Sequence, residues 1–145
     1  MTASPLGDAA EIERLAAALA RITRTTRRRT KLPLGASSIS ALAIVVDQGP
    51  TRLGDLAKIE GITPATLSRI IAVLEEEGYA RRSSDESDRR SSFLEVTPAG
   101  RRMLTKARKD RALVVRASVE RLTTDERQLL SAALPALESL ADAGE

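Results

Sequence analysis

The sequence predicts a mainly α-helical fold that is interrupted once by a small β-hairpin. Over most of the 145 residues, apolar side chains recur at steps of three and four, which is the spacing of amphipathic helices. The period changes to two within residues 79–96, where two short runs flank a polar segment. Tyr79 and Phe93 are the only aromatic residues, so the core must be built from aliphatic side chains.

Two amphipathic helices are expected in the first third of the chain. The first covers residues 10–31, with apolar residues along one stripe. The second covers residues 37–48, where Ser37 or Ser38 would supply the N-cap and Gly49 would end the helix. Both helices carry enough apolar surface to need a packing partner.

A helix pair joined by a tight turn is expected next. Residues 54–60 form a short helix, and Gly61 interrupts it. Thr63 is a good N-cap and Pro64 follows it at the first helical position, where the missing N–H costs nothing. This second helix of the pair extends from there to about residue 77.

Extended segments follow and precede this pair. The runs 79–84 and 92–96 flank the polar residues 85–91 and read as a hairpin, and residues 51–53 form a short extended piece before the helix pair.

Two long helices complete the chain. Thr97 caps a helix over residues 98–121, and Thr123 with Glu126 has the capping-box spacing that opens the last helix. Pro135 lies inside that last helix and is a candidate for a kink.

Composition excludes several classes of function. The chain has no cysteine and no histidine, which rules out disulfides, thiol redox sensing, Cys/His metal sites and Ser-His or Cys-His catalysis. The consecutive acids 75–77 point around a helix and not into one site. We therefore expect no enzyme activity, no metal site and no cofactor.

No targeting or membrane segment is expected. Residues 1–11 lack the basic start and apolar region of a signal peptide, and the longest apolar run, residues 41–46, is too short to cross a bilayer. A cytoplasmic protein without membrane association is the expectation.

Basic residues are clustered although the net charge is only +3. Arginines gather at residues 27–29, 81–82 and 89–90. Acidic residues gather near the two termini and at residues 75–77. Local basic patches suit a polyanion that meets one face of the protein. The alternative is that these arginines are solvated surface groups.

The helix pair within residues 53–74 has the pattern of a helix-turn-helix, in which a glycine permits a sharp turn between two closely packed helices. Its second helix would present short hydroxyl groups and one arginine at its N-terminal end, suited to phosphates and base edges in a major groove. The candidate DNA-binding residues of this helix are Thr63, Pro64, Ala65, Thr66, Ser68 and Arg69.

The polar loop of the hairpin supplies a second candidate contact, formed by Asp88, Arg89 and Arg90. An arginine at a loop tip can enter a narrow minor groove. The alternative is a solvated loop in which Asp88 pairs with one of the two arginines, and that aspartate could also orient one arginine while the other reaches DNA.

Three motifs together resemble the multiple-antibiotic-resistance regulator (MarR) family of winged helix-turn-helix proteins. They are LGDLA at residues 53–57, ITPATLSRIIAVLEEEGYARR at 62–82 and DRRSSFLEVTPAG at 88–100. The last is similar to the wing signature of the family at Asp88, Arg90, Thr97 and Gly100, and departs from it at Val96, where the family has leucine.

The resemblance implies a homodimer that binds pseudo-palindromic double-stranded DNA and represses transcription. Residues 63–77 would be the recognition helix and residues 85–91 the tip of the wing. Many members of the family release DNA when a small amphipathic effector binds between the dimer and DNA-binding regions. A pocket would lie among residues 15–30, 40–46 and 104–117. Ser37, Ser38 and Arg82 are further candidates for contacts with the DNA backbone.

The expected domain organisation is a single subunit over residues 1–145. Residues 36–98 would form the winged helix-turn-helix, and residues 10–32 and 99–143 the dimerisation helices. A subunit this small cannot readily bury the apolar stripes of its first and last helices by itself, which favours a dimer. The alternative is that these stripes pack within the subunit.

Two other classes of function compete with a ligand-responsive repressor. A protein-interaction module with the same fold would not need arginines in the wing and would more often have an acidic or apolar outer helix face. An enzyme without cysteine or histidine would need paired carboxylates or a lysine in a cleft, and the consecutive glutamates 75–77 do not point into one site.

Overall fold

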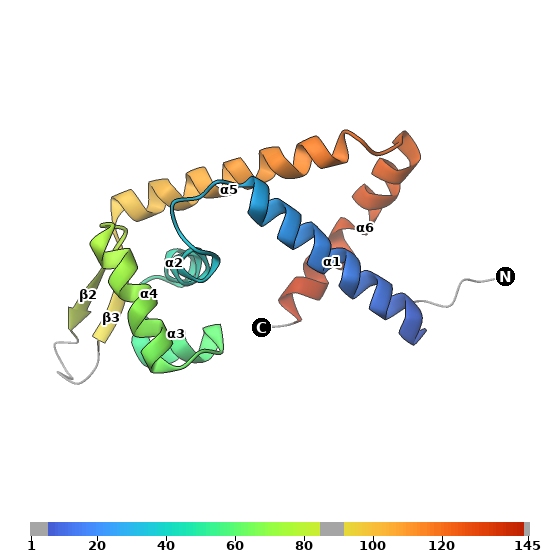
Figure 1. Cartoon of the computed structure of the whole chain (residues 1–145). Helices are drawn as coiled ribbons and strands as arrows, with labels where there is room; N and C mark the ends of the chain where they lie inside the picture. The colour runs from blue at the N-terminus through green and yellow to red at the C-terminus, as the bar shows by residue number, and fades with distance from the viewer. Residues whose placement is uncertain (1–5, 85–91, 144–145) are drawn as a thin grey trace.

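The computed structural model describes residues 6–84 and 92–143. Figure 1 shows the arrangement: the hairpin, α2, α3 and α4 gather near one end of the long helix α5, while α1 and α6 lie toward its other end. The elements in chain order are α1 (Ala9–Arg29), α2 (Ala36–Gln48), β1 (Thr51–Arg52), α3 (Leu53–Glu60), α4 (Pro64–Glu76), β2 (Ala80–Ser84), β3 (Ser92–Val96), α5 (Pro98–Val119) and α6 (Thr124–Asp142).

The small sheet is antiparallel and has the strand order β1-β3-β2. Thr51 pairs with Leu94 on one side of β3, and Arg82 pairs with the same Leu94 on the other side. Leu94 is fully buried, so the middle strand brings the sheet onto the helices. The predicted hairpin runs and the short extended piece are thereby confirmed.

One aliphatic core holds α2, α3, α4, the sheet and the first half of α5 together. Burying a leucine or isoleucine side chain completely contributes about 1.5–3 kcal/mol, so this cluster dominates the stability of the part of the chain formed by α2, α3, α4, the sheet and the first half of α5. Its largest fully buried side chains are Leu42, Val45, Leu56, Ile71, Leu74 and Leu94. An ion pair on the surface, from Arg108 Nη2 to the Asp47 carboxylate at 3.3 Å, also joins α5 to α2.

The terminal helices have the opposite character, because neither α1 nor α6 contains a buried residue. Leu129 of α6 is 71% exposed and Leu113 of α5 is 63% exposed. Ile12 and Ile22 of α1 are exposed as well. The subunit therefore leaves apolar surface uncovered along all three of these helices.

Capping residues begin three of the helices as expected. The Oγ1 atoms of Thr63, Thr97 and Thr123 accept hydrogen bonds from backbone N–H groups at 3.1–3.2 Å, and Thr123 and Glu126 complete the capping box. The prediction for α2 was wrong, since its N-cap is Gly35 and no side chain caps it.

Pro135 lies inside α6, and the helix continues through it from Thr124 to Asp142. Within the described part of the chain, no helix is both long and apolar enough to cross a bilayer.

Candidate nucleic-acid interface

A tight turn sets the angle between α3 and α4. Gly61 has φ 62°, in the left-handed region that favours glycine, and it caps the C-terminus of α3. Its N–H donates to the carbonyl of Lys58 at 3.1 Å, and the N–H of Ile62 donates to the carbonyl of Ala57 at 3.0 Å. These bonds end α3 and direct the chain into α4 within three residues.

The N-terminus of α4 is built by Thr63 and Pro64. Thr63 Oγ1 accepts from the N–H of Thr66 at 3.2 Å and lies 3.0 Å from Thr66 Oγ1. Pro64 fills the first helical position, where a backbone donor would have no partner in the helix. The two threonine hydroxyls therefore form one polar cluster at the exposed start of the helix.

The two faces of α4 differ sharply. Leu67, Ile70, Ile71 and Leu74 are buried in the core. The remaining side chains of its first half form an exposed face made of hydroxyl groups, a small apolar pair and one arginine: Thr63, Pro64, Ala65, Thr66, Ser68 and Arg69. Arg69 is exposed, and among the described residues no hydrogen bond or ion pair holds its guanidinium, which carries five donors.

A glutamate fixes the base of the hairpin. Glu95 of β3 accepts from Arg81 Nε at 2.9 Å and from Ser83 Oγ at 2.9 Å, both on β2. The hydrogen bond from Ser83, with that from Arg81, lowers the pKa of the Glu95 carboxyl below its ordinary value. This face of the hairpin is therefore held by a charge-assisted network.

A second glutamate joins α4 to the hairpin. Glu75, in the last turn of α4, accepts from the backbone N–H of Arg82 at 3.2 Å with Oε1, and its Oε2 lies 3.3 Å from Arg82 Nε. The side chains of Glu75 and Arg82 are 36% and 43% exposed. Arg82 was expected to contact the DNA backbone, and in the free subunit its guanidinium is paired with Glu75.

The other candidate residues are less uniform in position. Ser37 is exposed in the first turn of α2, whereas Ser38 is 7% exposed and belongs to the core side of that helix. The wing candidates Asp88, Arg89 and Arg90 lie outside the described residues.

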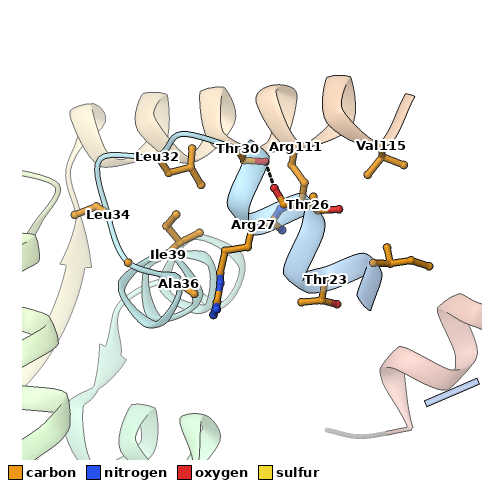
Figure 2. Close-up of a pocket in the computed structure, with 12 residues that line it drawn as sticks. Thr23, Thr26, Arg27, Thr30, Leu32, Leu34, Ala36, Ile39, Arg111 and Val115 are labelled. Carbon is orange, nitrogen blue, oxygen red and sulfur yellow. Dashed lines mark hydrogen bonds between the residues drawn. The ribbon is translucent and has the colours of Figure 1, made fainter. Parts of the chain in front are cut away.

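A pocket of about 670 Å³ lies between the C-terminal half of α1, the following loop, the start of α2, and α5. Figure 2 shows Arg111 extending from α5 in the direction of Thr26 and Arg27 reaching toward the first turn of α2 at Ala36. The walls include residues from the expected ranges 15–30 and 104–117, but the third wall is residues 32–39 and not 40–46. The lining residues are Ile22, Thr23, Thr26, Arg27, Thr30, Leu32, Leu34, Gly35, Ala36, Ile39, Arg111 and Val115.

Sequence reasoning missed the roles of both Glu95 within the hairpin and Glu75 between α4 and the hairpin. The alternation of β3 places Glu95 opposite Arg81 once the register is known, so the hairpin register was the available signal. No comparable local signal marks Glu75, which meets Arg82 only because the chain reverses at Gly78 with φ 72°.

Known proteins resemble the chain in sequence and in fold. The model of the MarR family matches residues 34–92. An uncharacterised HTH-type transcriptional regulator of Mycobacterium bovis is 29% identical over 129 residues, which cover 88% of this chain and 90% of that protein.

Solved structures extend the similarity to the flanking helices. The crystal structure of MarR is 25% identical with a TM-score of 0.73, covering 89% of this chain and 98% of the other. A putative transcriptional regulator of Pseudomonas aeruginosa is 28% identical with a TM-score of 0.74, covering 90% and 92%. Each alignment covers about nine-tenths of this chain, so the similarity in fold extends beyond the helix-turn-helix.

Proposed function

Because the chain belongs to the MarR family of DNA-binding transcriptional regulators, we propose that two copies of it bind a pseudo-palindromic operator and repress transcription from it. The observation that carries this proposal is the exposed face of α4, where hydroxyl groups and the exposed Arg69 surround the capped start of the helix. Such a face suits insertion into a major groove.

The chemistry of this face divides into two roles. The backbone N–H groups at the start of α4 and its partial positive charge favour a phosphate, which positions the protein without reading sequence. Thr66, Ser68 and Arg69 reach base edges, and an arginine there suits the two acceptors of guanine. Asp88, Arg89 and Arg90 are proposed as a second, minor-groove contact from the wing.

The proposed dimer uses the apolar surface that α1 and α6 leave uncovered. Residues 10–32 and 99–143 would form the dimer interface, and residues 36–98 of each copy would bind DNA. A two-fold dimer places the two copies of α4 on successive turns of the duplex, roughly 34 Å or a multiple of it apart. The two-fold symmetry of the dimer explains why the operator is expected to be an inverted repeat, and the distance sets the spacing of its half-sites.

The proposed control is release of DNA by a small amphipathic effector in the pocket between α1, α2 and α5. Leu32, Leu34 and Ile39 supply apolar contact there, whereas Arg27 and Arg111 supply positive charge. The pocket contacts both a proposed dimerisation helix and the first helix of the DNA-binding lobe, so an occupant can bias their relative position. A bacterial cytoplasm is the proposed site of action.

Selection of binding sites from a random duplex library tests the function. The wild-type protein should enrich an inverted repeat, and its affinity for that repeat should fall steeply as salt rises, since bound arginines release counterions from DNA. A pool without any enriched sequence, or binding that is insensitive to salt, would contradict the proposal and would favour a protein-interaction module.

A further inference from the structure

We propose that Glu75 is a positioning residue for DNA binding, which holds the hairpin β2–β3 at a fixed orientation to the recognition helix α4. This inference rests on the proposed function, because it concerns how two DNA-contacting elements are held together. The two oxygens of the carboxylate have separate tasks: Oε1 accepts from the Arg82 backbone N–H and Oε2 pairs with the Arg82 guanidinium.

The location of Glu75 is electrostatically unfavourable for α4 by itself. Three consecutive glutamates, residues 75–77, lie at the C-terminal end of this helix, and no basic residue lies in its last turn. Negative charge at a helix C-terminus is repelled by the helix dipole. Among the described residues, Glu75 is the member of this trio whose carboxylate has a partner, so its cost is offset by the contact with the hairpin.

The contact between Glu75 and Arg82 joins α4 to β2. Glu75 lies on the last turn of α4, while Arg82 is the middle residue of β2 and pairs with the buried Leu94 of β3. Glu95 already fixes β2 to β3 through Arg81 and Ser83. Glu75 therefore adds a polar link from the hairpin to α4, beside the aliphatic core that already packs Leu94 against the helices.

A positioning role for Glu75 also predicts the direction in which DNA affinity changes when its carboxylate is removed. DNA is a polyanion, so removal of a carboxylate near the interface should strengthen binding if the residue acts by charge alone. A positioning residue has the opposite effect: its loss weakens DNA binding, because the orientation of the hairpin relative to α4 is then held by the aliphatic core alone.

The experiment compares Glu75→Ala with Glu76→Ala, which removes the same charge from an exposed neighbour. The probe is the duplex that the wild-type protein selects from a random library, and the measurement is fluorescence anisotropy. We expect E75A to weaken binding by about fivefold or more, the lower end of what one groove contact contributes. We expect E76A to bind as tightly as the wild type or more tightly. Equal affinities of E75A and E76A would overturn the proposal.

A double-mutant cycle with Arg90→Ala separates this inference from the proposed function. If Glu75 acts by presenting the wing, E75A should cost little once Arg90 has been removed, whereas independent roles give additive losses. Additive losses would overturn the positioning role. An R90A variant with unchanged affinity would instead contradict the wing contact of the proposed function.

Folding is checked by thermal unfolding of each variant. Alanine relieves repulsion at the end of α4, so E75A should keep the melting temperature of the wild type. If E75A does not fold, Glu75→Gln replaces it in the same cycle, since glutamine keeps the size and the oxygen that accepts from the Arg82 N–H but loses the ion pair. E75Q with wild-type affinity and an additive cycle would then overturn the proposal.

Discussion

A Cβ atom on Gly100 would lie 2.0 Å from the carbonyl oxygen of Tyr79, so the first turn of α5 crosses the start of β2 at a distance that only glycine permits. The same carbonyl accepts from the N–H of Thr97 at 3.0 Å, and Thr97 Oγ1 donates to the carbonyl of Gly78 at 2.7 Å. The long helix is therefore fixed directly to the end of the DNA-binding lobe.

Gly100→Ala should destabilise the protein, because the backbone of Tyr79 must move away from the added methyl group. The expected loss is about 1–3 kcal/mol, as for other overpacked sites. Chemical denaturation measures it. Gly54→Ala in α3 is the matched control, since a Cβ there has open space, and it should leave the stability unchanged or raise it. Equal effects of the two variants would contradict the close packing of α5 on β2.

Thr63→Ala should lower the stability of α4 by about 1 kcal/mol, because the N–H of Thr66 loses its acceptor. The measurement is the shift of the unfolding midpoint. Thr105→Ala is the control, since the Thr105 hydroxyl donates to the carbonyl of Arg101 within α5 and caps nothing. A Thr63 variant as stable as the Thr105 variant would count against the capping role.

Leu134→Glu should weaken the dimer. Leu134 of α6 is 50% exposed in the free subunit. A carboxylate placed in an apolar interface is desolvated without a partner, so the dissociation constant of the dimer should rise by about tenfold or more. Sedimentation equilibrium gives this constant. The exposed Gln128→Glu on the same helix is the control for added charge, and dimers of equal strength in both variants would argue for a different interface.

Acidification should remove the stability that Glu95 contributes. Its pKa is lowered in the folded state, chiefly by the hydrogen bond from Ser83, so the contribution is complete above the ordinary glutamate pKa and is lost as pH falls. The relevant window opens below about pH 4.3 and extends downward through the folded pKa. Melting temperatures measured across this window should fall less in Glu95→Gln than in the wild type. Parallel curves would show that the network around Glu95 does not matter for stability.

The sequence predicted the elements of the fold because its local signals are strong. Thr63 followed by Pro64, and Thr123 followed by Glu126, mark helix starts that depend only on neighbouring residues. Cap formation by Ser37 or Ser38 was predicted wrongly because α2 begins one residue earlier, at Ala36. With the helix starting at Ala36, Ser38 lies on the buried side of α2.

The candidate site was predicted in part for a similar reason. The outer face of α4 follows from the helix period and from the buried positions of Leu67 and Leu74, so its polar residues could be named from the sequence. The pairing of Glu75 with Arg82 depends on how the chain reverses at Gly78, which is a tertiary relationship that no periodicity encodes.

The most direct test of the central claim repeats the binding-site selection with Arg69→Ala. Because Arg69 is exposed and unpaired among the described residues of α4, its loss should relax the selected sequence at one position of each half-site. It should also weaken binding by about 1–3 kcal/mol. Arg116→Ala, on α5 and paired with Glu120, should select the wild-type sequence with wild-type affinity. If R69A also retained both the wild-type sequence preference and its affinity, α4 would not be the helix that reads DNA.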